Sequence, residues 1–168
     1  MDALKYIQHY PAPVKQQVEE LIASERLRDY LKRKYPVNHH IASDKALRTY
    51  VLELKNRYLK KTSALNQVGF DNHLHVVENA LGVHKRQSRV QGAKLKRHQS
   101  IWISSQFKKA PSAFLEMIVV HELAHLKELE HNKAFYSLCE YMLPEYHQRE
   151  FDMRLYLIQQ AIDKNSIS

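Results

Sequence analysis

Cysteine is nearly absent from this chain, since Cys139 is the single one among 168 residues. One thiol can neither close an internal disulfide nor assemble a cysteine zinc site, which excludes a disulfide-rich scaffold and a zinc ribbon. The first residues lack the basic region and apolar run of a signal peptide, and no stretch approaches the length of a membrane span. We therefore expect a cytoplasmic protein without a membrane partner.

Glycine is scarce as well, and Gly69, Gly82 and Gly92 all fall in one stretch of the chain. This concentration indicates turns or bulges in a small sheet. Repeats and low-complexity tracts are missing, while 44% hydrophobic and 26% charged residues are globular proportions. We expect one domain over residues 1–168, with a helical N-terminal part (1–62) followed by the sheet and further helices (63–168).

Acidic residues are missing between Glu78 and Glu116, although the whole chain carries a formal net charge of +8. A local positive field attracts phosphate-bearing or nucleic-acid partners better than a diffuse basic bias does. The alternative is a solvated surface that only keeps the protein soluble. The acid-free stretch holds eight cations, of which the first six are the candidate phosphate contacts: Lys85, Arg86, Arg89, Lys94, Lys96, Arg97, Lys108 and Lys109.

Apolar periodicity predicts helices at both ends of the chain and strands between them. The pattern changes toward strands from Gly69 to Ser105, including residues 73–77 and 101–103. We therefore expect an α+β fold with a small, mostly antiparallel sheet. Helical spacing is found after Pro11, from Ser43 or Asp44 to Tyr58, from Ala113 to about Leu129, after a cap at Asn132, and after Pro144.

His121-Glu122-Leu123-Ala124-His125 is the segment in which residue type, spacing and surroundings indicate the same chemistry. Residues four apart on a helix lie one turn above each other, so both imidazoles can reach one metal ion. Glu122 points to the side, where it can act as general base on a water that the metal activates. The apolar helix around the motif makes unpaired polar groups costly to bury, which favours a bound cation over exposed helix residues.

A catalytic zinc ion (Zn2+) needs a third protein ligand, and His131 is the candidate. The helix must then end between His125 and His131, because six further residues of helix would carry His131 to the opposite side. Leu129 or Glu130 should make this turn, since no Gly, Asn or Pro lies between the two histidines. The alternative third ligand is a later glutamate, namely Glu140, Glu145 or Glu150.

The segment from about Arg89 to Tyr156 resembles the YgjP-like family of zinc-dependent metalloproteins, relatives of the WLM and SprT-like peptidases. The matching text is Met117 to Leu126 around the motif, followed by His131 to Tyr136. The resemblance implies a zincin-like fold with the motif helix packed under a small sheet. It also implies zinc ligands at His121, His125 and His131, with Glu122 as catalytic base.

Three functions fit these observations. The first is a zinc metallopeptidase, in which a strand containing Ile101-Trp102-Ile103 holds an extended peptide or protein substrate by strand addition, unless that run is a core strand. The second is a nucleotide or polyphosphate hydrolase, such as a nucleoside triphosphate pyrophosphatase, at the same metal site. The third is a DNA-associated metallopeptidase module whose basic stretch contacts phosphates.

Other polar residues have simpler explanations. His39, His40, His73 and His75 lack acidic or cysteine partners nearby, so we expect surface or strand residues. Cys139 should be a small packed side chain. Candidates for stabilising an oxyanion are close to the motif along the chain: Tyr136, Tyr141, Tyr146 and His147.

Overall fold

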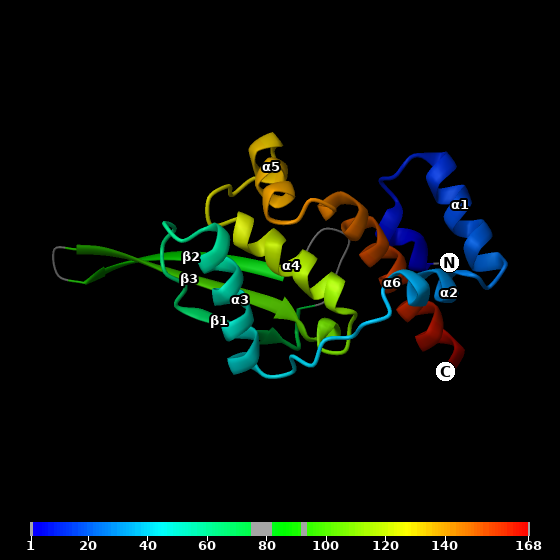
Figure 1. Cartoon of the computed structure of the whole chain (residues 1–168), viewed down its shortest axis with the longest axis horizontal. Helices are drawn as coiled ribbons and strands as arrows, with labels where there is room; N and C mark the ends of the chain where they lie inside the picture. Colours follow the sequence, from blue (N-terminus) through cyan, green and yellow to red (C-terminus); the bar gives the residue numbers. More distant parts are fainter. Residues whose placement is uncertain (1, 75–81, 92–93, 168) are drawn as a thin grey trace.

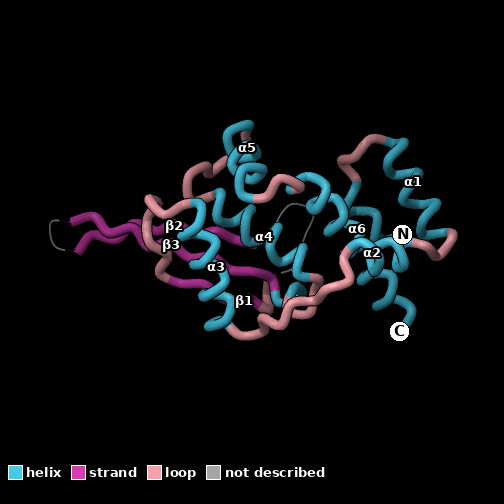
Figure 2. The backbone as a smooth tube through the Cα atoms, viewed as in Figure 1, coloured by secondary structure: helices cyan, strands magenta, loops and turns pink. Residues whose placement is uncertain are grey.

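The computed structural model describes residues 2–74, 82–91 and 94–167, with the side chains of residues 3–74 and 99–167. The chain combines helices with one small sheet, so the fold is α+β as expected (Figures 1 and 2). In chain order the elements are η1 (Asp2–Ile7), α1 (Ala12–Ala23), α2 (Leu27–Lys34), α3 (Asp44–Tyr58), β1 (Gln67–Asp71), β2 (Gly82–Gln91), β3 (Lys94–Ser104), η2 (Ser105–Phe107), α4 (Ser112–Ala124), α5 (Lys133–Met142) and α6 (Tyr146–Ile167).

The sheet has the strand order β1-β3-β2, with β3 in the middle. β2 and β3 are antiparallel, and Gly82 pairs with Ile103. β1 joins β3 in parallel, with Gln67 opposite Ser100, so the expectation of a mostly antiparallel sheet is corrected at this edge. After β1 the chain passes to β2, the opposite edge strand. The β2–β3 hairpin then reverses its direction, so that β3 runs between β1 and β2 and parallel to β1. Of the strand expected at 73–77, residues 73 and 74 are not strand and 75–77 lie outside the described residues.

α3 and α4 cross in front of the sheet in Figure 1, and the β2–β3 hairpin extends beyond them as a two-stranded ribbon. The cap predicted for α3 is confirmed, since the Ser43 side chain accepts a hydrogen bond from the Ala46 N–H at 3.1 Å. Asp44 then fixes the helix to the sheet, because its Oδ1 accepts from the Phe70 N–H at 2.8 Å. These contacts set the position of β1 and, through it, of the sheet under α4.

α4 is buried on nearly all sides, as its uninterrupted apolar sequence predicts. Its residues from Met117 to Ala124 are all buried, including His121 and Glu122. The helix ends at Ala124 rather than near Leu129, so the turn toward His131 begins earlier than expected. Apolar core residues thus surround His121 and Glu122. Burying these two polar side chains lowers the stability of the fold unless each of them has a partner.

The N-terminal helices pack against α6, which runs from the middle of the molecule to its far end (Figure 1). The contact centres on Asp152, a fully buried carboxylate. It accepts hydrogen bonds from the hydroxyls of Tyr30 and Tyr35 and from Gln148, and it pairs with the Lys34 Nζ at 2.8 Å. The C-terminal end of α2 is therefore bound to α6 through the ion pair between Lys34 and Asp152.

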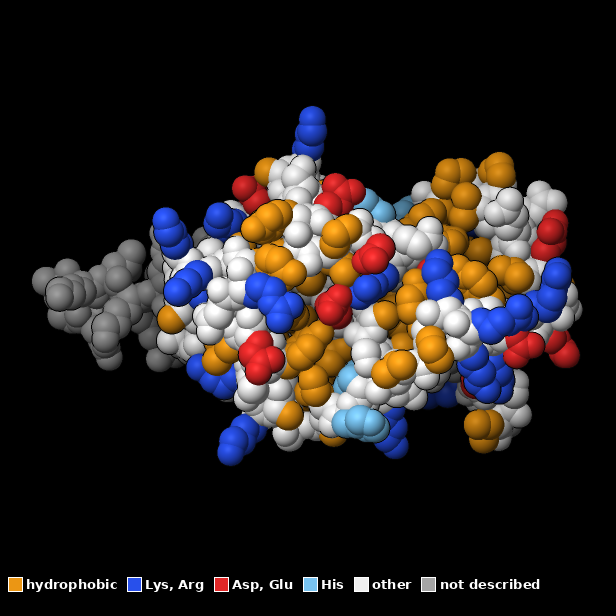
Figure 3. Space-filling model, in the orientation of Figure 1, with side chains coloured by type: hydrophobic (Ala, Val, Ile, Leu, Met, Phe, Trp, Pro, Cys, Tyr) orange, Lys and Arg blue, Asp and Glu red, His pale blue; other side chains and the backbone are white. Residues whose placement is uncertain are grey.

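Charged side chains cover much of the surface, and Figure 3 shows Lys and Arg side chains spread over the face drawn, with acidic ones among them. The side chains of Lys85, Arg86, Arg89, Lys94, Lys96 and Arg97 lie outside the described ones, so their expected phosphate contacts stay a prediction. In the part of the chain that the structure describes, none of the helices combines the length and apolar character that crossing a membrane requires.

Candidate metal centre

Three imidazole rings converge at the end of α4. The Nε2 atoms of His125 and His131 are 3.1 Å apart, and those of His131 and His121 are 3.3 Å apart. Among the described residues these three form the group of His, Cys, Asp or Glu side chains whose ligand atoms all lie within 4.8 Å of one another. The structure thus brings together all three predicted histidines, from the last turn of α4 and the loop that follows it.

The spacing of these nitrogens fits a tetrahedral ion. Ligand nitrogens about 2.05 Å from a tetrahedral zinc ion lie about 3.3 Å apart, close to the two observed distances. Three ring nitrogens with their lone pairs turned toward one point repel each other unless a cation lies between them. The donor set and its geometry therefore fit a divalent metal ion, although they do not specify which one.

The turn that brings His131 back follows directly after α4. The N–H groups of Leu126 and Glu128 bond to the carbonyls of Leu123 and Ala124 at 3.0 Å, which ends the helix in a tight turn. In the segment 125–131, all of it described, no residue takes a positive φ. A helix break between the motif and His131 was predicted and is present, in ordinary backbone geometry and without the glycine that such turns often use. Its expected position at Leu129 or Glu130 was wrong, because the chain leaves the helix directly after Ala124.

The hydrogen bond of His125 Nδ1 determines which of its two ring nitrogens carries the proton. His125 Nδ1 lies 2.9 Å from the backbone oxygen of Glu128, and a carbonyl can only accept a hydrogen bond. Nδ1 of a neutral His125 therefore carries the proton, and the lone pair of Nε2 is directed toward the other two rings. Hydrogen bonds of this kind orient histidine ligands in metal sites and fix their tautomer.

Phe135 forms an apolar wall behind the three rings. Its ring centroid is 4.9 Å from that of His121, 4.6 Å from that of His125 and 4.9 Å from that of His131, and the side chain is fully buried. Burial, together with the neighbouring imidazoles, lowers the pKa of His121 to about 3, and burial also lowers the pKa of His125. Both rings therefore stay neutral near pH 7, which is the form that binds a metal.

Glu122 follows His121 in α4 and has 1% of its surface exposed. Its Oε2 is the buried side-chain atom that has no hydrogen-bond partner within the described structure. Burial raises the pKa of Glu122 to about 8. The side chain is therefore mostly the neutral acid near pH 7, and a buried polar atom without a partner is costly, which makes Glu122 a candidate functional group.

The glutamates considered as alternative third ligands are engaged elsewhere. Glu140 pairs with His147 at 3.2 Å, Glu145 pairs with Arg149 at 3.4 Å, and Glu150 pairs with Arg154 at 2.9 Å. None of them belongs to the group of converging ligand atoms in the described chain. The geometry therefore favours His131 over these glutamates.

The four nominated oxyanion partners are placed very differently. Tyr141 is 65% exposed and its ring faces Tyr58, away from the cluster. Tyr146 is fully buried, and its hydroxyl lies 2.7 Å from the outer nitrogen of His121, so it supports a ligand instead of facing a substrate. Tyr136 remains close, with its ring centroid 6.4 Å from that of His131 and 5.3 Å from that of His147.

The other histidines whose side chains the structure describes are not part of this site. His39 joins two loops, because its Nδ1 accepts from the Ile41 N–H at 3.0 Å and its Nε2 lies 2.6 Å from the Phe107 carbonyl oxygen. His73 is exposed, and His75 lies outside the described residues. Cys139 is fully buried, and burial raises the pKa of its thiol to about 12, in agreement with the expected packed side chain.

Sequence reasoning missed the groups that hold the ligands from behind, namely the Glu128 carbonyl, Phe135 and the Tyr146 hydroxyl. Phe135 carries a usable signal, because it lies four residues after His131 in an apolar helical pattern. The role of Tyr146 carries none, because its contact with His121 spans 25 positions and depends on how α6 packs.

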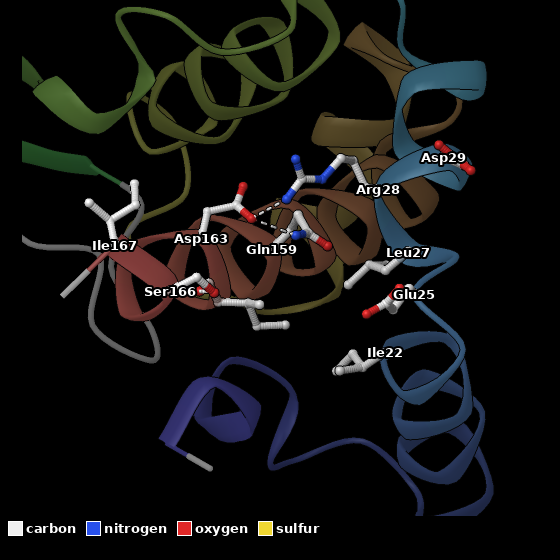
Figure 4. A pocket seen from close by; sticks show the side chains of 10 residues that line it. Ile22, Glu25, Leu27, Arg28, Asp29, Gln159, Asp163, Ser166 and Ile167 are labelled. Atoms are coloured by element: carbon white, nitrogen blue, oxygen red, sulfur yellow. Dashed lines mark hydrogen bonds and ion pairs between the residues drawn. The ribbon is translucent and has the colours of Figure 1, made fainter.

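A hollow of about 700 Å³ lies between the α1–α2 corner and the end of α6 (Figure 4). Its lining includes Arg28, which pairs with Asp163, and Gln159, which also donates to Asp163. None of its lining residues belongs to the histidine cluster. The chemistry of a metal site is therefore confined, among the described residues, to the end of α4.

Comparisons with known proteins agree with this geometry. The family model described as YgjP-like, metallopeptidase domain matches residues 45–155. A UTP pyrophosphatase of Escherichia coli (strain K12) is 52% identical over 167 residues, which cover 99% of this chain and 100% of that protein. No solved structure matches the chain. The chain therefore belongs to the YgjP-like family, and this membership together with the histidine cluster supports a metal-dependent hydrolase.

Proposed function

We propose that the protein is a zinc-dependent hydrolase that cleaves nucleoside triphosphates, with UTP as the first substrate to test, and releases pyrophosphate. His121, His125 and His131 hold the ion in a zincin-like site, and Glu122 is the general base. The observation that carries the proposal is the convergence of three imidazole nitrogens at the end of α4, the helix that also holds Glu122 with a buried, unpartnered Oε2. The substrate class rests on the UTP pyrophosphatase that is 52% identical along the whole chain.

An ion held by His121, His125 and His131 would supply Lewis-acid activation of water and stabilisation of negative charge on phosphoryl oxygens. Glu122 accepts the proton of the attacking water, for which a pKa raised by burial is well suited. The water oxygen bonds to the α-phosphorus, the bond from that phosphorus to the bridging oxygen breaks, and pyrophosphate leaves with the nucleoside monophosphate as second product. Phe135 packs against the three imidazole rings, and Glu122 is itself buried, so bulk water has little access to the base.

The position of residues 101–103 within the sheet argues against binding of a peptide substrate by strand addition. Ile101 and Ile103 are fully buried, and β3 is paired on both sides at these residues, with β1 and with β2. Strand addition needs an edge whose N–H and C=O groups are free, so the run 101–103 cannot accept a peptide in this way. Of the two possibilities considered for Ile101-Trp102-Ile103, the structure has the core strand and not the peptide-binding edge.

A metallopeptidase is the second candidate, because the matching family model is described as a metallopeptidase domain. The same base and ion can direct water at a peptide carbonyl. A DNA-associated form of this activity rests on the basic stretch, from Lys85 to Arg97, which could equally hold a triphosphate. Binding of DNA through these cations should weaken steeply between about 50 and 200 mM salt, whereas salt-independent binding contradicts this form.

The deciding experiment measures pyrophosphate release by the zinc-loaded protein from UTP, CTP, ATP and GTP, alongside cleavage of an unfolded protein. We expect pyrophosphate release, and Glu122→Gln should retain about one zinc per chain while losing about 100-fold or more in kcat. Glu140→Gln is the matched control, because Glu140 is exposed and pairs with His147, and it should keep both zinc and activity. Cleavage of the unfolded protein without nucleotide turnover would favour the second candidate.

A further inference from the structure

The hydrogen bond behind His121 is short and buried. His121 Nδ1 lies 2.7 Å from the hydroxyl of Tyr146, with His121 9% exposed and Tyr146 fully buried. His121 is attached to α4 and Tyr146 is the first residue of α6, so this contact also joins the two helices. At this distance the two atoms bond directly, and which of them donates the hydrogen depends on the other hydrogen bonds that the two side chains make.

The direction of this bond determines whether His121 can bind a metal. If the Tyr146 hydroxyl donates to Nδ1, the proton of the neutral ring must sit on Nε2, which then has no lone pair for an ion. If Nδ1–H donates to the Tyr146 oxygen, Nε2 is free as a ligand. The second arrangement requires another acceptor for the Tyr146 hydroxyl proton, because a buried hydroxyl without an acceptor is unfavourable.

The thiol of Cys139 is the candidate for that acceptor. Its side chain is fully buried on α5; burial raises the pKa of the thiol, and a hydrogen bond from the Tyr146 hydroxyl acts in the opposite direction. Sulfur is a weak acceptor, but for a buried hydroxyl a weak acceptor is better than none. Such a bond would connect His121 through Tyr146 to α5.

We propose that Tyr146 and Cys139 form a positioning relay, in which His121 Nδ1–H donates to the Tyr146 oxygen and the Tyr146 hydroxyl donates to the Cys139 sulfur, so that His121 Nε2 is held ready for the ion. The relay rests on the proposed metal centre and does not depend on which substrate is hydrolysed. Neither residue is catalytic, because neither reaches the reacting atoms.

The first test compares Tyr146→Phe with Tyr156→Phe in the full chain. Tyr156 lies on the same helix and packs against Phe114, so the substitution removes the same atom away from the cluster. The readouts are Zn2+ affinity by competition with a chelator and the visible spectrum of the Co2+ form. Tyr146→Phe should weaken Zn2+ affinity about tenfold or more and shift the Co2+ bands, whereas Tyr156→Phe should do neither.

The second test separates the relay from packing at Cys139. Cys139→Ala removes the acceptor and should weaken Zn2+ binding several-fold, while Cys139→Ser keeps an acceptor and should bind nearly as wild type does. Adding Cys139→Ala to Tyr146→Phe should give no further loss, because the relay is already broken. Denaturant unfolding of each metal-free variant shows that affinities are compared between folded proteins.

Three results overturn the relay: unchanged Zn2+ affinity in Tyr146→Phe, equal affinities in Cys139→Ala and Cys139→Ser, or losses that simply add in the double variant. Failure of the proposed function is distinguishable from these results. A protein that shows the expected affinity pattern but releases no pyrophosphate retains the relay and loses the substrate assignment. A wild-type protein that binds no Zn2+ loses both.

Discussion

At the scale of single residues, Gly69 shows how closely α3 packs against the sheet. Gly69 lies in β1 opposite Trp102, and a Cβ at this position would stand 2.7 Å from Trp102 Cζ3 and 3.1 Å from Asp44 Cγ. Asp44 also accepts the hydrogen bond of the Phe70 N–H. The space that a side chain would need is therefore already filled by the contact between α3 and the sheet.

Gly69→Ala should lower the free energy of unfolding by about 1–3 kcal/mol, because the Trp102 ring or Asp44 must move to admit the methyl group. Denaturant unfolding of the metal-free protein measures the loss. In a Trp102→Ala background the same substitution should cost clearly less, since the nearest atoms are gone. An equal loss in both backgrounds would show that close approach to the Trp102 ring is not the cause.

The candidate site was largely predictable at this scale for a local reason. His121, Glu122 and His125 lie within one helical turn and His131 follows six residues later, so short-range geometry alone brings them together. The supporting residues were not predictable in the same way. Tyr146 was nominated to stabilise an oxyanion, but the packing of α6 on α4 turns its hydroxyl to the back of His121.

At the scale of helices and strands, the start of α5 sets the position of His131. The Asn132 side chain accepts from the Phe135 N–H at 2.9 Å and caps the helix, as the sequence predicts. His131 directly precedes this cap and is itself exposed. The third ring is thus held by the helix start and by Phe135 more than by burial.

Asn132→Ala should lower the free energy of unfolding by about 1 kcal/mol and should also weaken Zn2+ affinity, because the residue next to the third ligand loses its anchor. Ser43→Ala removes the equivalent cap from α3 and is the matched control. It should lower stability by a similar amount and leave Zn2+ affinity unchanged. Chelator competition on both variants checks the difference, and equal affinities would contradict a role for the cap in placing His131.

A second element-scale contact holds α2 on α6 through the buried carboxylate of Asp152. Asp152→Ala should lower the free energy of unfolding by about 3 kcal/mol, because it leaves the hydroxyls of Tyr30 and Tyr35 and the Lys34 ammonium without their acceptor. Asp163→Ala, also on α6, breaks the partly exposed contacts with Arg28 and Gln159 seen in Figure 4 and should cost less than about 1 kcal/mol. Denaturant unfolding compares the two variants, and similar losses would contradict the importance of burial.

Sequence patterns predicted helices better than strand pairing. The caps at Ser43 and Asn132 and the apolar stripes of the helices are local signals, and the corresponding helices are present. The parallel pairing of β1 with β3 was not visible, because it joins segments about 33 positions apart with a hairpin between them. The helical character of the N-terminal part was predicted, but its division into α1 and α2 was not, since the few apolar residues of α2 are held by contacts with α6.

At the scale of the whole molecule, α6 connects the two parts that the sequence distinguishes. Its first residue supports His121, while its later turns pack against η1 and α2 at the other end of the molecule (Figure 1). Arg154 strengthens this connection by donating to the Tyr6 carbonyl oxygen at 2.9 Å. The N-terminal helices, which lie mostly outside the matched segment 45–155, thereby hold the helix on which the metal site depends.

We therefore expect the metal-free protein to unfold in one transition, with circular dichroism and tryptophan fluorescence giving the same midpoint, as a single domain over residues 1–168 requires. An ion that binds only the folded chain stabilises it by RT ln(1 + [L]/Kd), about 2.7 kcal/mol at free Zn2+ one hundred times the Kd. The midpoint temperature should then rise with Zn2+ concentration for the entire transition, since α6 couples both parts to the site. The double variant His121→Ala and His125→Ala should show no such rise, and two separate transitions, of which Zn2+ shifts only one, would show that the parts unfold independently.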